Sequence, residues 1–140
     1  MSIGARRPAA LRWHPEIFVQ GNLAIADEIV APEFVWHAAG LPETPLGPEG
    51  VKQIATAYRA AFGNLEIVDE DIVTQGDTTA YRFTLRGIHN AELLGAAPTG
   101  KQIEVRGFDL FHTRNGKLAE MWQVWDRLGF LQQVGATNAK

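Results

Sequence analysis

Two aspartates stand inside apolar stretches near the end of the chain, where an ionisable side chain needs a physical reason. Asp109 lies within GFDLF and Asp126 within QVWDRL. Such a carboxylate must be paired, cap a helix or take part in chemistry, because burying an unpaired charge costs free energy. Asp109 is therefore a candidate general base, and an ion pair with Arg82 or Arg106 is the alternative. For Asp126, the N-cap of a following helix is the favoured interpretation.

A β-hairpin is predicted to position Asp109. Asn115-Gly116 separates two stretches of β-forming residues and is typical of a tight hairpin turn. Side chains alternate between the two faces of a strand, so each strand has one face of mixed polarity and one that is largely apolar. A cavity tolerates mixed polarity better than a packed interface does. We therefore assign to the cavity the face that carries Arg82, Thr84, Asp109, Phe111, Gln123 and Trp125.

The opposite face is predicted to be an aromatic wall that is too apolar to face water. Helices are expected to cover one side of the sheet and a second subunit the other. The wall is expected to combine Tyr81, Phe83, Leu85, Phe108, Leu110, Trp122 and Val124.

The elements that carry these residues follow from hydrophobic periodicity and turn signals, with helices before strands. Helices are predicted over about 8–20 (interrupted by Pro15), 23–30, 50–62 and 127–134, and strands over about 33–37, 65–74, 78–88, 101–113 and 117–126. This order is typical of an α+β domain with a curved antiparallel sheet. We expect a single domain over residues 1–140, in which sheet and N-terminal helices enclose a cone-shaped cavity suited to a small ligand.

Composition excludes several classes of function. The chain has 140 residues, no Cys, and Ser2 as its only serine, which excludes disulfides, thiolate zinc sites and cysteine or serine nucleophiles. The net charge is −3 and the 13 basic residues are scattered, so no nucleic acid or membrane partner is expected. No signal peptide or membrane span is recognisable, and the cytoplasm is the expected compartment. The four histidines have no metal-binding spacing, so neither a metal nor a cofactor is expected.

Aromatic and histidine side chains supply the candidates for ligand contacts. His37, which follows Trp36 on a short strand under the helices, is a candidate cavity donor or acid. For His89 the alternative is a structural hydrogen bond to loop backbone, and for the tryptophans and Phe62 it is ordinary core packing. The ligand-binding candidates are Trp36, His37, Phe62, Thr84, His89, Phe111 and Trp125.

The order of elements and several segments resemble SnoaL-like proteins. The matching segments are 21–23, 27–28, 31–37, 87–89, 94–100, 115–117, 122–126, 128–129 and 133–135. The resemblance covers nearly the whole chain and implies the cone fold of the nuclear-transport-factor-like superfamily, usually dimeric through the open sheet face. It also implies polyketide-cyclase activity, which closes a ring by intramolecular aldol condensation without metal or cofactor.

Two positions depart from the cyclase pattern. Counted from the Asn-Gly-Lys turn, the cavity His of the cyclases corresponds to Asp109 and their acid/base Asp to Gln123. Gln cannot exchange a proton near neutral pH, but it can donate a hydrogen bond to an enolate oxygen. Limonene-epoxide-hydrolase-like proteins share the cone and need an Arg between two acids. Arg82 matches that Arg, whereas Thr84 and Gln123 stand where the acids belong.

The sequence therefore predicts a small-molecule-binding protein with cyclase-type activity. In this hypothesis Asp109 abstracts a proton α to a carbonyl, and Gln123 and Arg82 stabilise the enolate oxygen. The alternatives are a hydratase, dehydratase, isomerase or epoxide-hydrolase-like enzyme for a steroid- or terpene-sized ligand, and a non-catalytic carrier of an apolar compound. The expected partners are a hydrophobic or polyketide-like small molecule and a second copy of the chain.

Overall fold

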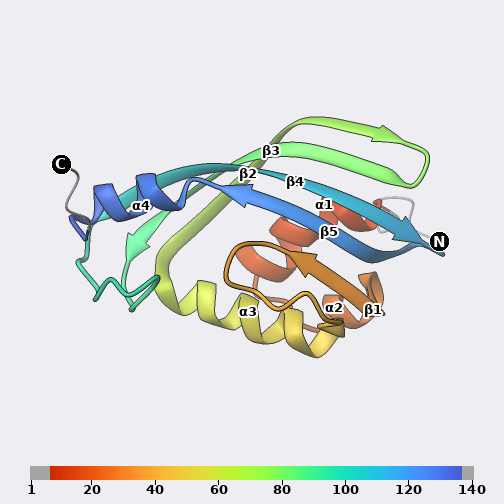
Figure 1. Ribbon diagram of the computed structural model, residues 1–140, viewed down its shortest axis with the longest axis horizontal. Helices are drawn as coiled ribbons and strands as arrows, with labels where there is room; N and C mark the ends of the chain where they lie inside the picture. The colour runs from red at the N-terminus through yellow and green to blue at the C-terminus, as the bar shows by residue number, and fades with distance from the viewer. Residues whose placement is uncertain (1–6, 137–140) are drawn as a thin grey trace.

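A computed structural model describes residues 7–136, which form one curved sheet with helices against one of its faces (Figure 1). Ser2 lies outside the described residues. The elements in chain order are α1 (Ala9–Arg12), a π-helical segment η2 (Trp13–Val19), α2 (Ile25–Ile29), β1 (Val30–His37), α3 (Gly47–Ala61), β2 (Phe62–Gln75), β3 (Thr78–His89), β4 (Gln102–Arg114), β5 (Lys117–Trp125) and α4 (Arg127–Gln133).

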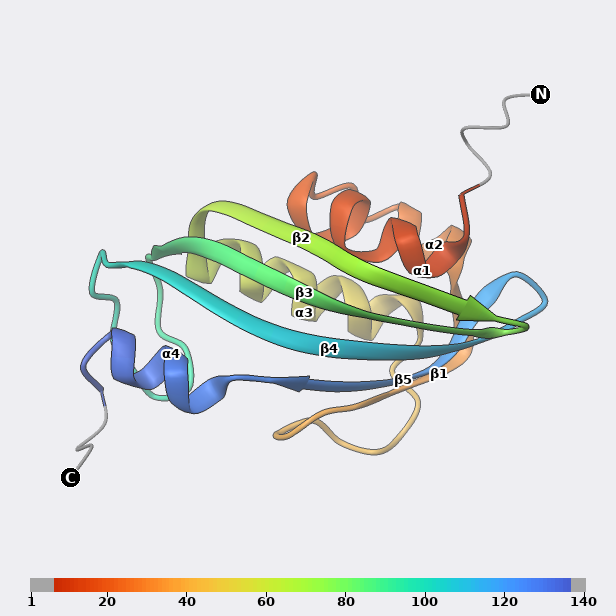
Figure 2. The same cartoon turned by 90° about the horizontal axis from the view of Figure 1, so that it is seen from above.

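The sheet has the strand order β1-β5-β4-β3-β2. Strands β2 to β5 form an antiparallel meander, whereas β1 pairs with β5 in parallel. The two views show the sheet curving over α1, α2 and α3, with α4 at the end of the sheet farthest from α1 (Figures 1 and 2). The predicted α+β architecture is therefore confirmed, and the parallel pairing of β1 is its one departure from an all-antiparallel sheet. No helix between residues 7 and 136 is long and apolar enough to cross a membrane.

Pro15 marks the change of the first helix from α to π geometry. A proline inside a helix has no N–H to donate and its ring presses on the preceding turn, so the helix must widen there or break. The Pro15 carbonyl accepts from the Gln20 N–H at 3.0 Å, a bond to the fifth residue along the chain. This widened segment buries Trp13, His14, Ile17 and Phe18 against the sheet.

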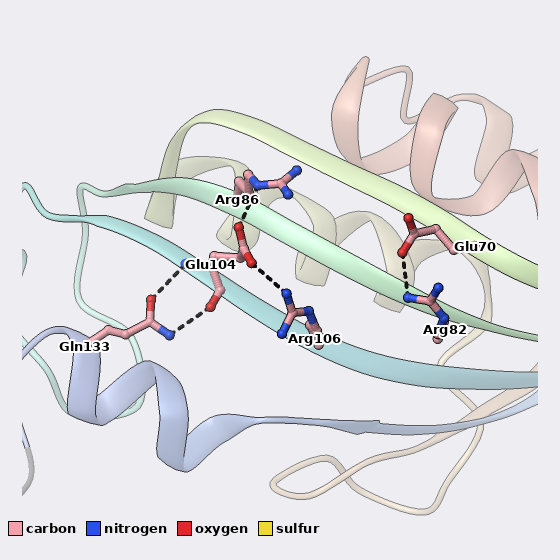
Figure 3. A network of polar contacts seen from close by, with 6 residues as sticks. All are labelled: Glu70, Arg82, Arg86, Glu104, Arg106 and Gln133. Carbon is pink, nitrogen blue, oxygen red and sulfur yellow. Dashed lines mark hydrogen bonds and ion pairs between the residues drawn. The ribbon is translucent and has the colours of Figure 1, made fainter.

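Local signals at the end of the chain have the predicted effects. Asn115 and Gly116 both have positive φ, 52° and 79°, and join β4 to β5. Asp126 caps α4, since its Oδ1 accepts a 2.8 Å hydrogen bond from the Gly129 N–H. The last helix is also held to the sheet by Gln133, whose amide exchanges two 2.8 Å hydrogen bonds with the Glu104 backbone (Figure 3).

The register of the sheet decides which residues face the helices. Tyr81 lies opposite Asp109, and Asp109 opposite Gln123, so these three share the inner face. Arg82 lies opposite Phe108, which in turn lies opposite Val124, and this row forms the outer face. The predicted aromatic wall is therefore wrong. The β3 residues Tyr81, Phe83 and Leu85 face inward, whereas Phe108, Leu110, Trp122 and Val124 of β4 and β5 face outward.

Candidate functional site

A narrow pocket opens between the inner face of the sheet and the helices. All gaps between its atoms and the open mouth together amount to about 410 Å³, but only about 20 Å³ of this space is wide enough for the centre of a water molecule. Its walls are largely aromatic and aliphatic, and polar groups are few. The residues that line it are His14, Phe18, Trp36, Tyr58, Phe62, Ile67, Phe83, Leu85, Val105, Gln123 and Trp125.

At the polar wall of the pocket, His14 lines the surface and contacts two buried carboxylates behind it. His14 of η2 lies between Asp69 of β2 and Asp109 of β4. The distance from His14 Nδ1 to Asp69 Oδ1 is 2.7 Å, a short hydrogen bond, and that from His14 Nε2 to Asp109 Oδ2 is 3.6 Å. The three side chains are nearly sealed from solvent, with exposed fractions of 4% for His14, 8% for Asp69 and 0% for Asp109.

Gln123 links Asp109 to the pocket on the other side. Its Nε2 donates a 3.0 Å hydrogen bond to Asp109 Oδ1, and the bond joins directly opposed residues of β4 and β5. One hydrogen of the Gln123 amide is engaged in this way. Its other amide hydrogen and its carbonyl oxygen have no partner among residues 7–136, so they are free to bind a ligand in the pocket that Gln123 lines.

Burial makes the Asp109 carboxyl harder to ionise than it is in water. Burial raises the pKa of Asp109 to about 6, while the positive charge of a protonated His14 and hydrogen bonding from Gln123 and Tyr81 act in the opposite direction. Asp109 Oδ2 and the Tyr81 hydroxyl have no hydrogen bond of normal geometry among the described residues. A carboxyl group with a pKa near neutrality can both take up and release a proton at physiological pH.

Four of the predicted site residues line the pocket. They are Trp36, Phe62, Gln123 and Trp125. Asp109 lies on the same inner face, but behind His14 and Gln123 rather than on the pocket surface. That Trp36, Phe62, Gln123 and Trp125 contact a ligand, and that Asp109 takes part in catalysis, stay predictions.

The placement of Arg82 and Thr84 in the cavity is wrong. Both lie on the outer face, because the β3 residues opposite the inner residues of β4 are Tyr81 and Phe83. Arg82 is exposed and forms an ion pair with Glu70 at the surface (Figure 3). It forms a second ion pair with Asp71. It is therefore out of reach of an enolate in the pocket.

None of the three remaining ligand-binding candidates, His37, His89 and Phe111, lines the pocket. His37 sits on the sheet edge, where its ring bonds Glu43 and Glu120 and stacks on Trp122. These two carboxylates raise the pKa of His37. His89 is fully buried, and its Nδ1 lies 3.0 Å from Thr99 Oγ1. The alternative interpretation expected a structural hydrogen bond to loop backbone. The hydrogen bond is structural, but its partner is the Thr99 side chain.

Phe111 faces inward but belongs to the solid core. It packs against the rings of Trp13 and Tyr81, with centroid distances of 5.4 Å and 6.1 Å. Phe111 is fully buried and does not line the pocket.

Sequence reasoning missed His14, Asp69 and Tyr81. His14 stands alone in a predicted helix without another histidine nearby, and Asp69 stands in the acidic stretch from Asp69 to Asp71, which resembles a solvated surface. Alternation along β2 contained a usable signal, because Asp69 shares a face with Ile67 while Glu70 does not. Among residues 7–136, no group of three His, Asp or Glu side chains is arranged to hold a metal ion.

Comparison with known proteins identifies the relatives of this chain. A protein of the same fold is IdmH from Streptomyces antibioticus, named a "putative polyketide cyclase", with 31% identity over 92% of this chain and 99% of that one and a TM-score of 0.75. A second, a "putative polyketide cyclase" from Acidithiobacillus ferrooxidans, is 27% identical over 98% and 100% of the two chains with a TM-score of 0.80.

More distant chains share the architecture. AclR from Streptomyces galilaeus, named a "putative hydroxylase", has a TM-score of 0.78 at 19% identity over 99% of this chain and 86% of that one, which establishes the fold alone. No curated protein matches the chain in sequence. The family model of the SnoaL-like polyketide cyclases matches residues 9–134. The chain therefore belongs to the SnoaL-like polyketide cyclase family.

Proposed function

We propose that this protein is a cofactor-independent enzyme that abstracts a proton α to a carbonyl group of a polyketide-like ligand and closes a ring by aldol-type addition. The observation that carries the proposal is the Asp109 carboxyl, buried at the polar wall of an otherwise apolar pocket, with a pKa of about 6. The chemistry of the pocket suits a neutral ketone, because the apolar walls match its carbon skeleton and its oxygen needs only one or two donors. The walls must separate to admit such a ligand, because the interior has little free volume.

The reaction divides into two steps that need no external reagent. In the first step, a C–H bond next to the carbonyl breaks and its electron pair forms the enolate. The proton passes to the buried Asp109 carboxylate. The free amide hydrogen of Gln123 is suited to stabilise the enolate oxygen. In the second, the enolate carbon bonds to a second carbonyl carbon of the same molecule, and the resulting alkoxide recovers the proton.

These groups supply a moderate acceleration. A positioned base contributes about 10²- to 10⁴-fold and one oxyanion donor about 10²- to 10³-fold. Such factors suffice for a ligand activated by neighbouring carbonyls. The same first step without ring closure would be an isomerase reaction, and the test below applies to both.

The first step is tested by exchange of α-hydrogens for deuterium in 2-tetralone, a neutral bicyclic ketone, followed by proton NMR in D₂O. We expect catalysed exchange by the wild type and a loss of about 10²- to 10⁴-fold in Asp109→Asn. Asp71→Asn is the matched control, because Asp71 is an exposed acid of the same strand as Asp69. Wild-type activity in Asp109→Asn, or binding without exchange in the wild type, would contradict the enzyme proposal and favour a carrier.

We also propose that a second copy of the chain covers the outer face of the sheet. Val124 and Phe108 are 73% and 64% exposed there, beside the partly exposed Trp122. On the same sheet, Glu70 pairs with Arg82, and Glu104 pairs with Arg86 and Arg106 (Figure 3), so the charged side chains are already neutralised within one chain. An exposed apolar patch of this kind is typical of an interface between two copies. Sedimentation should give a dimer for the wild type and a monomer for Val124→Arg, and a monomeric wild type would refute this pairing.

A further inference from the structure

We propose that His14 carries the proton between the pocket and Asp109, and that Asp69 is a positioning residue that holds the His14 ring in one tautomer. This inference rests on the proposed function and adds the route of the proton.

The pocket surface leaves few groups that can transfer a proton. The Asp109 side chain has no exposed surface and does not line the pocket, while His14 and Gln123 line it and contact Asp109. Gln123 cannot exchange a proton near neutral pH. Tyr58 is the other titratable residue of the lining, and burial raises its pKa above the ordinary value, so it stays protonated. His14 is thus the lining residue placed to pass a proton to Asp109.

The contact with Asp69 determines which nitrogen of His14 holds the fixed proton. An ionised carboxylate only accepts hydrogen bonds, so the 2.7 Å contact requires a proton on Nδ1. Asp69 is buried, and this is its one hydrogen bond or ion pair among residues 7–136. An acid that is held in the interior by a single histidine is suited to orient that ring.

The second nitrogen of His14 then faces Asp109. With Nδ1 protonated, a neutral ring presents a lone pair at Nε2, 3.6 Å from Asp109 Oδ2, an atom without a hydrogen bond of normal geometry among residues 7–136. Two acceptors facing each other repel, and one shared proton removes the repulsion. The pair of His14 and Asp109 therefore has room for one mobile proton at the wall of the pocket, and this is the proton that the ligand gives up.

The remaining surroundings of His14 do not compete for this proton. The titratable groups facing its ring are Asp69 from β2, Tyr81 from β3 and Asp109 from β4. Burial and the nearby acids raise the pKa of Tyr81 well above its ordinary value, so its phenol stays neutral. The aromatic rings of Phe18 and Phe83 pack on the other sides.

The proton transfer balances within the protein. The electron pair of the breaking C–H bond stays on the ligand as the enolate, and the proton bonds to Nε2 of His14, from which it can pass to Asp109 Oδ2. The imidazolium formed is stabilised by Asp69 at Nδ1 and by the ionised Asp109 beside Nε2. After ring closure, Nε2 returns the proton to the alkoxide.

The positioning role is tested without a ligand, from two-bond proton–nitrogen NMR spectra of protein carrying nitrogen-labelled histidine. The His14 signals are assigned by their loss in His14→Gln. We expect the fixed proton on Nδ1 in the wild type and in Asp109→Asn. In Asp69→Asn it should move to Nε2, because Asp109 is then the remaining carboxylate. Asp71→Asn should match the wild type. A wild type with its fixed proton on Nε2, or Asp69→Asn with an unchanged tautomer, would overturn the role of Asp69.

The role of His14 as the proton carrier is tested by the 2-tetralone exchange described above. His14→Gln and Asp69→Asn should each lower kcat by about 10²- to 10⁴-fold with KM changed by less than about threefold. Full activity of His14→Gln, while Asp109→Asn is inactive, would overturn the carrier role and leave the proposed function standing. Absence of exchange in the wild type would overturn the carrier role together with the proposed function, and the tautomer measurement would still decide the role of Asp69.

Discussion

Asp109→Asn should change the pH dependence of stability in a direction set by the buried carboxyl. The pKa of Asp109 rises from 3.8 to about 6 in the folded protein. Between these two values the unfolded chain releases the proton while the folded protein keeps it, so stability falls as pH increases. Above about pH 6 both states are ionised and the loss is complete and constant.

The size of the effect follows from the pKa difference. One pKa unit corresponds to about 1.4 kcal/mol, so a rise of about two units amounts to about 3 kcal/mol. Asparagine has nearly the same shape, keeps an oxygen that can accept from Gln123, and does not ionise. Relative to the wild type, Asp109→Asn should therefore gain about 3 kcal/mol between about pH 3.5 and about pH 8.

Urea unfolding at several pH values measures this difference. Asp71→Asn serves as the control, since Asp71 is exposed and pairs with Arg82 at the surface. A stability difference between Asp109→Asn and the wild type that does not vary with pH would refute a raised pKa for Asp109. The expected gain at neutral pH would also show that the wild type retains a destabilising charge at its candidate site.

Three further outcomes are expected. Arg82→Gln should leave the 2-tetralone exchange rate within about twofold and change the free energy of unfolding by less than about 1 kcal/mol, because its ion pairs are exposed; a large loss of exchange would return Arg82 to the site. Asp126→Ala should cost about 1 kcal/mol in urea unfolding by removing the cap of α4, whereas an unchanged midpoint would argue against the cap. Gly107→Ala should destabilise by about 1–3 kcal/mol, because an added Cβ would lie 2.5 Å from Phe83 Cζ and 2.6 Å from the Val124 oxygen; wild-type stability would show that the sheet yields there.

Local chemistry made much of the fold predictable. Four features needed only neighbouring residues: the hairpin turn at Asn115-Gly116, the cap at Asp126, the disturbance at Pro15 and the helical periodicity of α3. The strands begin and end within a few residues of the predicted limits. Such signals act over one or two turns of chain, so the sequence alone determines them.

The pairing of strand faces was beyond the reach of alternation. Alternation correctly placed Arg82 and Tyr81 on opposite faces of β3, and Asp109 and Phe108 on opposite faces of β4. It does not say which face of β3 lies beside which face of β4. That choice depends on register, and a shift of one residue exchanges the faces. The register places Tyr81 opposite Asp109, which moves Arg82 out of the site and leaves a nearly apolar cavity.

The sequence by itself determined the class of fold and the family, and it placed Asp109 and Gln123 together on one face of the β4–β5 hairpin. Only the tertiary structure brought His14 to Asp69, 55 residues away, and to Asp109, because the meeting of a helix with two strands is set by long-range packing. Burial then changed the chemistry of the group. A carboxyl has an ordinary pKa in an open chain, and it acquires one near neutrality once the fold has removed the surrounding water.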